Sequence, residues 1–146
     1  MIERAGLVLR IERTFDSPAE EVFRAWTSEE VLRRWIHAGA DWQTPEARVD
    51  LRVGGALRVV MRDPEGTDHG ASGEYTEIDP PRRLVFTWTW DRLPDNPLLI
   101  ELEFTERRGT TTVVLTNSGL PTEEESRGHE RGWHLCFDNL ERVLAR

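Results

Sequence analysis

The sequence predicts an α+β fold in one domain, residues 1–146, with an antiparallel sheet of about seven strands and a long C-terminal helix. Two observations indicate this fold. From about residue 45 to residue 116, apolar and polar side chains alternate with a period of two, in six stretches separated by short turns. The stretch after Pro121 instead repeats apolar side chains at steps of three and four, which is typical of a helix. Consecutive strands with short connections favour an antiparallel meander.

The N-terminal part predicts one strand and two short helices. The strand covers Leu7 to Thr14. Residues 17–20 resemble a capping box with Ser17 as the cap, and residues 27–30 resemble a second one with Thr27 as the cap. Two short helices in succession can clamp across a sheet. Their apolar stripes, and that of the strand, consist of Leu9, Ile11, Val22, Phe23, Trp26, Val31, Leu32 and Trp35.

The stretch from Val53 to Trp90 predicts three consecutive strands. Turns are expected at Gly54-Gly55, at residues 63–66 and at residues 79–81, where glycine, proline and aspartate gather. The last of these strands ends in two tryptophans on one face, which indicates a bulky, half-buried side of the sheet. Across all strands of this region the expected inward positions are Ala47, Val49, Leu51, Val53, Leu57, Val59, Met61, Leu84, Phe86, Trp88, Trp90, Leu98, Ile100, Leu102 and Phe104.

The C-terminal helix is expected to begin at a capping box of Thr122 and Glu125 and to run close to Arg146, a length of roughly 30 Å or more. Gly128 and Gly132 each cost such a helix about 1 kcal/mol relative to alanine. Either the helix packs tightly on the sheet at these positions, or they leave space at the mouth of a cavity. The inward face is expected to carry His129, Trp133, Cys136, Leu140 and Val143 or Leu144.

Composition excludes several function classes. The formal charge is −8, with 27 acidic and 19 basic residues, which disfavours nucleic acid as a partner. All 19 basic residues are arginine, so chemistry that requires a lysine is excluded. The single cysteine, Cys136, cannot form an internal disulfide, and no apolar run approaches about 18 residues, so no membrane span and a cytoplasmic location are expected. No cofactor signature occurs, and His129 and His134 are wrongly spaced for a metal site.

Several segments resemble a known family. The segment at 15–23 and Trp35, with the order of elements, are similar to the START/polyketide-cyclase-like (SRPBCC) superfamily. Residues 53–55, 73–75, 78–84 and Gly132-Trp133 resemble its activator-of-heat-shock-chaperone-ATPase-homologue (AHSA-like) branch. The resemblance implies a helix-grip fold: a curved antiparallel sheet wrapped around the long C-terminal helix, with a largely apolar internal cavity. Members of the superfamily bind lipids, polyketides and other hydrophobic molecules, and some catalyse cyclisation or dehydration.

The expected ligand-binding residues follow from this hollow fold. They are Trp35, Met61, Glu74, Phe86, Trp88, Ile100, Leu102, His129 and Trp133. The aromatic and aliphatic members either line the cavity or form ordinary core. Glu74 has the parity of Ile78, so it either points inward, where burial raises the pKa of a carboxyl, or is returned to solvent by a bulge. His69, beside Gly70, could form the rim of the cavity entrance, and no residue is assigned a catalytic role.

The sequence therefore favours binding of an unidentified hydrophobic small molecule, with no cofactor or metal. One alternative is a cavity enzyme of the cyclase, dehydratase or hydrolase type that uses Glu74 or His129. Another is a co-chaperone-like stress-response protein whose partner is a chaperone. The eukaryotic namesake of the branch acts with an additional N-terminal domain for which this chain has no room, so we expect that role to transfer poorly. A monomer and a homodimer are both open.

Overall fold

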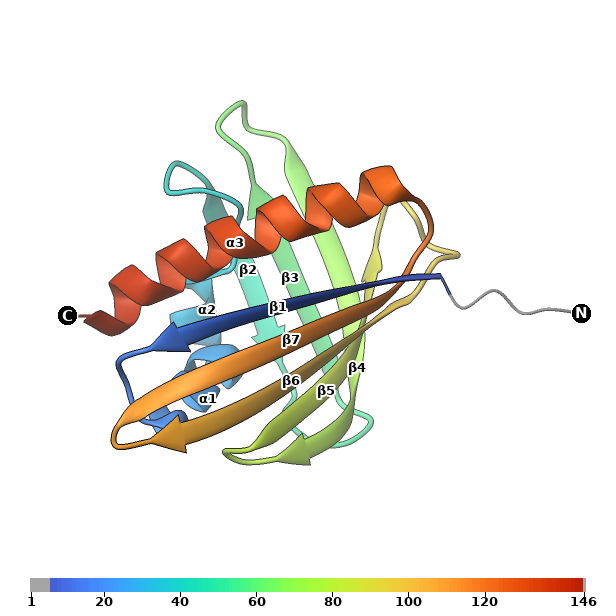
Figure 1. Ribbon diagram of the computed structural model, residues 1–146. Helices are drawn as coiled ribbons and strands as arrows, with labels where there is room; N and C mark the ends of the chain where they lie inside the picture. Colours follow the sequence, from blue (N-terminus) through green and yellow to red (C-terminus); the bar gives the residue numbers. More distant parts are fainter. Residues whose placement is uncertain (1–5, 146) are drawn as a thin grey trace, which may run out of the picture.

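The computed structural model describes residues 6–145 and confirms the predicted α+β fold (Figure 1). Three helices accompany seven strands in this part of the chain. The helices are α1 (Ala19–Thr27), α2 (Glu29–Trp35) and α3 (Glu123–Ala145). The strands are β1 (Leu7–Phe15), β2 (Gln43–Val49), β3 (Ala56–Arg62), β4 (Asp68–Asp79), β5 (Arg83–Trp90), β6 (Leu98–Arg107) and β7 (Thr110–Leu120).

The seven strands form one antiparallel sheet in the order β1-β7-β6-β5-β4-β3-β2. The predicted meander runs without interruption from β2 to β7, and β1 then pairs with β7 from Leu7 to Phe15. The sheet is strongly curved, and α3 lies across its concave side (Figure 1). Helices α1 and α2 lie near the C-terminal end of α3, and the two edge strands are β1 and β2.

The core lies between the concave face and the helices. The alternate residues from Leu84 to Trp88 in β5 and from Leu98 to Phe104 in β6 are buried there, as predicted from the alternation, whereas Trp90 is only partly buried. Trp26 of α1 is the centre of an aromatic cluster, with its ring 4.6 Å from that of Trp35 and 5.8 Å from that of Trp133. Asn139 of α3 ties this helix to the end of α2, because its side-chain amide donates to the carbonyl oxygens of Trp35 and His37 at 3.3 and 2.9 Å.

The starts of the first two helices differ from the prediction. Ser17 does not cap α1; the backbone N–H of Ala19 donates to the Glu106 carboxylate of β6 at 2.9 Å, so a distant strand satisfies the helix start. The cap of α2 is Ser28, one residue later than the predicted Thr27, and its hydroxyl accepts from the Val31 N–H. The cap of α3 is Thr122 as predicted.

Two strand and helix faces also differ. Leu51 and Val53 continue the alternation of β2 in sequence, but β2 ends at Val49, and both side chains are exposed in the following loop. On α3, Phe137 is buried although it was not among the expected inward positions, and its neighbour Leu135 is exposed. The turn at Gly54-Gly55 is confirmed: Gly54 has a positive φ of 87°, which is readily accessible to glycine.

Candidate functional site

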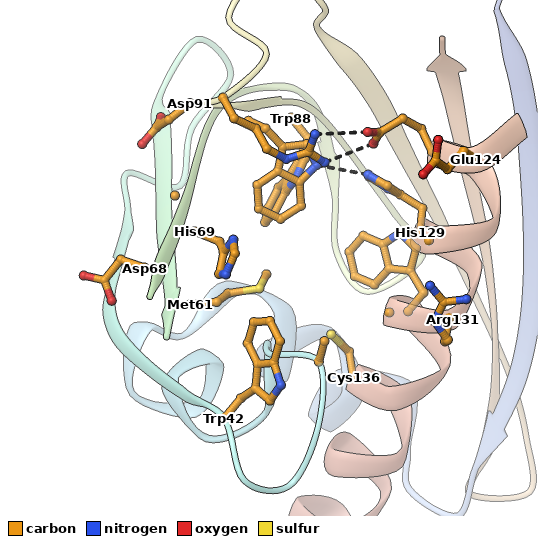
Figure 2. Close-up of a pocket in the computed structure, with 18 residues that line it drawn as sticks. Trp42, Met61, Asp68, His69, Trp88, Asp91, Glu124, His129, Arg131 and Cys136 are labelled. Carbon is orange, nitrogen blue, oxygen red and sulfur yellow. Dashed lines mark hydrogen bonds and ion pairs between the residues drawn. The ribbon is translucent and has the colours of Figure 1, made fainter. Parts of the chain in front are cut away.

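A cavity of about 500 Å³ lies between the N-terminal half of α3 and one end of the sheet. At this end β3 stops, β4 starts and β5 stops, so three neighbouring strands contribute side chains to one wall (Figure 2). The loop before β2 and the start of the β5–β6 connection close the sides. Charged side chains and two histidines line part of the wall, and the apolar and aromatic residues that line the rest are Ala38, Trp42, Met61, Trp88, Trp90, Trp133 and Cys136.

Two glycines on α3 create much of this space. Gly128, Gly132 and Cys136 follow one another at steps of four, and all three line the cavity. A Cβ atom added at Gly128 or at Gly132 would meet no heavy atom within 4 Å outside its own helix surroundings. The helix therefore does not pack tightly at these positions. Of the two interpretations of the glycines, the structure supports the one in which they leave space at a cavity.

A chain of hydrogen bonds connects α3 to strands β5 and β7 beside the cavity. The indole N–H of Trp90 donates to Nε2 of His129 at 3.0 Å (Figure 2). Nδ1 of the same ring lies 2.8 Å from Oδ1 of Asn117, which also accepts the Trp133 indole N–H at 3.2 Å. Because Nε2 accepts, Nδ1 must carry the proton of the neutral ring. Burial lowers the pKa of His129, Glu125 opposes this shift and Arg92 adds to it, so the neutral form is favoured.

An ion pair lies at the mouth beside this chain. Both terminal nitrogens of Arg92 bind the Glu125 carboxylate at 3.0 Å, which joins the β5–β6 connection to the first turns of α3 (Figure 2). The guanidinium also lies 5.8 Å from the centre of the Trp90 ring. Hydrogen bonding to Arg92 lowers the pKa of the Glu125 carboxyl. The mouth is thus held by two polar contacts between the same pair of segments.

His69 and Asp63 form a second polar pair, on the sheet side. Nε2 of His69 lies 3.0 Å from Oδ2 of Asp63, and the His69 ring lies against Trp42 with centroids 5.5 Å apart. His69 pairs with Met61 across β3 and β4, so both side chains point to the concave face. Figure 2 shows both directed toward the cavity. For His69 the sequence left a place at the rim of the entrance open, and the structure places it among the residues that line the cavity.

The structure brings four of the nine predicted binding residues to this cavity: Met61, Trp88, His129 and Trp133. Four others, Trp35, Phe86, Ile100 and Leu102, are fully buried in packed core and are not among the lining residues. Aromatic alternation identifies which residues face inward. It does not distinguish the filled part of an interior from the hollow part, because that depends on what lies opposite each side chain.

Glu74, the ninth expected binding residue, does not line the cavity: of the two positions left open for it, the solvent-exposed one is correct. The register between β4 and β5 shifts between Tyr75 and Glu77, so β4 contains one extra residue there. Tyr75 is therefore buried and shares its face with Ala71, while the parity of Ile78 no longer applies to Glu74. The alternative of a bulge that returns Glu74 to solvent is the correct one, although the bulge follows Glu74 instead of preceding it at Gly73.

Several lining residues escaped the sequence analysis. Trp42 lies in an irregular loop between α2 and β2, where no periodicity indicates direction. Arg92 and Glu125 lie 33 positions apart, and only the fold shows that they meet. Asp63 does not line the cavity itself; it was correctly assigned to a turn, and its contact with the lining residue His69 follows from the hairpin register.

The cysteine in the wall is not activated as a nucleophile. Burial raises the pKa of the Cys136 thiol to about 12, so it is a neutral part of the wall. Within residues 6–145, no three histidine, cysteine or acidic side chains gather in a way that could hold a metal ion. None of the helices in the same part of the chain has the length and apolar character needed to cross a bilayer.

A sheet wrapped around a C-terminal helix, with two short helices between β1 and β2, defines the helix-grip class of proteins. Among solved structures, a protein from Chromobacterium violaceum superposes with a TM-score of 0.85, covering 93% of this chain and 95% of that one. At 21% identity, this likeness shows the fold alone. A protein named AHSA1 from Silicibacter pomeroyi has a TM-score of 0.84 at 28% identity, covering 95% of this chain and 98% of that one.

Sequence comparison identifies the family. The family of activator of Hsp90 ATPase homolog 1-like proteins matches residues 16–145, and the chain belongs to this family. The human activator of 90 kDa heat shock protein ATPase homolog 1 is 27% identical over 138 residues, and the mouse protein is 25% identical over the same length. These matches cover 94% of this chain and 37% of each relative, so the chain spans a little over a third of their length.

Proposed function

We propose that the cavity under α3 binds a hydrophobic small molecule. The observation that carries the proposal is the cavity of about 500 Å³ with tryptophans on several sides and no side chain at Gly128 and Gly132. This volume is within the range of roughly 300–1,000 Å³ that is usual for small-molecule sites. The flat faces of Trp88 and Trp133 offer broad contacts to an aromatic or aliphatic ligand.

Filling the cavity from the helix tests this proposal. In Gly132→Leu, a leucine side chain would occupy the space that the glycine leaves, while leucine remains a good helix former. A panel of neutral flat aromatic compounds and a fluorescent fatty acid is titrated while tryptophan emission is recorded. We expect quenching with the natural sequence and a loss of affinity of roughly tenfold or more in Gly132→Leu, which corresponds to about 1.4 kcal/mol.

The matched control is Gly132→Ala, which adds a single methyl group and leaves most of the volume open. This variant should retain ligand binding within a few-fold of the natural sequence. Absence of quenching by every compound of the panel would contradict the proposal. Equal affinity in Gly132→Leu and the natural sequence would show that the ligand binds elsewhere.

The cavity-enzyme alternative loses the two groups proposed for it. Glu74 is exposed, and His129 has both ring nitrogens in hydrogen bonds, so neither offers a free base inside the cavity. General acid–base catalysis needs a group within hydrogen-bonding reach of the proton that it transfers. The enzyme alternative therefore has no support from Glu74 or from His129, and the cavity itself favours binding.

Interaction with a chaperone is the second candidate, and family membership favours it. The larger exposed apolar side chains among the described residues are Leu7, Val8, Leu51, Val53 and Leu135. Leu7 and Val8 belong to edge strand β1, whereas Leu51 and Val53 follow the opposite edge strand β2, so they do not form one patch. An ATPase assay of a 90 kDa heat shock protein with this chain tests the role, and stimulation at stoichiometric amounts would support it.

A further inference from the structure

The His69–Asp63 pair has a feature that the apolar cavity does not require: one ring nitrogen of His69 is left free. The hydrogen bond to Asp63 uses Nε2. Among the described residues, no polar atom of the protein bonds to Nδ1. His69 lines the cavity, and its ring is directed toward the cavity interior (Figure 2). A polar atom is thus available close to the aromatic part of the wall.

The surroundings of Asp63 determine which ring nitrogen of His69 carries the proton. Oδ1 of Asp63 accepts the backbone N–H groups of Glu65 and Thr67 at 3.0 and 2.9 Å, so the carboxylate is held in place by its own turn. These bonds and the one to His69 lower the pKa of Asp63, with the His69 bond the largest cause. An ionised carboxylate can only accept. Nε2 of His69 must therefore donate, and Nδ1 of the neutral ring carries a lone pair that no polar atom among the described residues uses.

The remaining contacts favour a neutral, flat ligand. The His69 ring lies against Trp42, with 33° between the planes, and Trp88 and Trp133 face the same space. The one lining guanidinium without a carboxylate partner among the described residues is Arg131, whose side chain is exposed. With a formal charge of −8, the chain does not attract anions. The lone pair at Nδ1 can accept a hydrogen bond, so the complementary group on the ligand is a hydrogen-bond donor.

We propose that His69, positioned by Asp63, is the polar anchor of the cavity and accepts a hydrogen bond from the hydroxyl group of a flat aromatic ligand. The inference rests on the proposed function and narrows its ligand class to hydroxylated aromatic compounds, such as phenols and naphthols. In this arrangement the hydroxyl lies at the β3–β4 side, and the ring system lies against the tryptophans. Asp63 touches no ligand and acts through the orientation and tautomer of His69.

A pair of ligands that differ only in the donor tests the inference. The affinities of 2-naphthol and 2-methoxynaphthalene are measured by isothermal titration calorimetry at pH 8. The natural sequence should prefer 2-naphthol by roughly three- to tenfold, the usual net value of one hydrogen bond. In His69→Phe the aromatic ring and its contact with Trp42 remain, but the hydrogen-bond acceptor is lost. The ratio of the two affinities should then fall to the value expected from the difference in hydrophobicity between the two compounds alone.

Asp63→Asn separates the tautomer from the presence of the ring. Because Oδ1 accepts two backbone N–H groups, the new amide nitrogen takes the place of Oδ2 and donates to Nε2. The His69 proton then moves to Nδ1, which becomes a donor that the oxygen of either compound can accept. Both compounds should still bind, and their affinities should differ by no more than about twofold.

The outcomes separate the two proposals. If both compounds bind the natural sequence and the ratio of their affinities is the same in His69→Phe, the anchor is refuted while the cavity still binds hydrophobic molecules. If the preference persists in Asp63→Asn, the tautomer argument is refuted. If neither compound binds the natural sequence, while other members of the panel do, hydroxylated aromatic compounds are the wrong class. Absence of binding by the whole panel refutes the proposed function itself.

Discussion

The two halves of α3 cover the same concave face, yet one covers packed core and the other covers a cavity. Under the C-terminal half, Phe137 meets the rings of Phe15 and Trp26 at centroid distances of 5.9 and 6.1 Å. Under the N-terminal half, Gly128 and Gly132 carry no side chain and leave open space. We call these the filled half and the hollow half of the interior.

The layers around the two halves differ as well. Helices α1 and α2 cover the filled half, and Asn139 fastens α3 to the end of α2. The hollow half has no such helix beside it; the loop with Trp42 and the β5–β6 connection enclose it, and the contacts of Trp90 and Arg92 hold α3 in place. Helix α3 thus packs into the core along its C-terminal half, where Phe137 is buried. Along its N-terminal half it covers the cavity as a lid, because Gly128 and Gly132 have no side chain to fill the space.

Phe137→Ala should have the largest effect, because it removes a fully buried ring from the filled half. We expect the free energy of unfolding to fall by about 3–5 kcal/mol, the usual cost of removing a buried phenylalanine side chain. Urea denaturation followed by tryptophan fluorescence measures it. The control is Leu135→Ala on the exposed side of the same helix, which should stay within about 0.5 kcal/mol. A loss below about 1 kcal/mol in Phe137→Ala would show that the filled half is poorly packed.

Gly132→Ala should have a smaller effect of the opposite sign. The added methyl group meets no neighbour, and alanine is favoured over glycine in a helix by about 1 kcal/mol, so the variant should be more stable by about that amount. Gly73→Ala in β4 is the contrasting case. Its Cβ would lie 1.9 Å from the backbone oxygen of Thr87, so stability should fall by about 1–3 kcal/mol. A destabilised Gly132→Ala in urea denaturation would mean that the hollow half is not open at this helix face.

Much of the filled half follows from the sequence, and much of the hollow half does not. Alternation in β5 and β6 predicted Phe86, Ile100 and Leu102 as inward, and all three are buried. Alternation fails where a strand gains a residue, as at the bulge after Tyr75 that returned Glu74 to solvent. Local rules also miss long-range partners, because Glu106 of β6 caps α1 in place of Ser17.

The cavity itself could be anticipated only in part. Gly128 and Gly132 are unfavourable in a helix, and this local conflict pointed correctly to a special role for the face that they share. Which residues oppose them depends on loops. Trp42 and His69 come from segments with no regular direction in the sequence, and they meet only because α2 and the β3–β4 hairpin place them side by side.

The smallest expected effect concerns the lid and its dependence on pH. The pKa of His129 is lowered in the folded protein, mainly by burial, so the folded state binds fewer protons than the unfolded state once the pH falls below about 6.5. Stability is then lost as the pH falls below this value. Protonation also puts a hydrogen on Nε2, where the Trp90 N–H now donates, so the contact between β5 and α3 breaks.

Urea denaturation at several pH values between 7.5 and 5 measures this loss, and the indole N–H resonance of Trp90 reports the contact directly. In His129→Gln, an amide can accept from Trp90 and donate to Asn117 at any pH. The contribution of residue 129 to the change of unfolding free energy with pH should therefore disappear. A residual slope is expected from His37, whose pKa is also lowered, chiefly by burial and also by Arg142. If stability depends on pH in the same way in His129→Gln and in the natural sequence, protonation of His129 does not loosen the contact between β5 and α3.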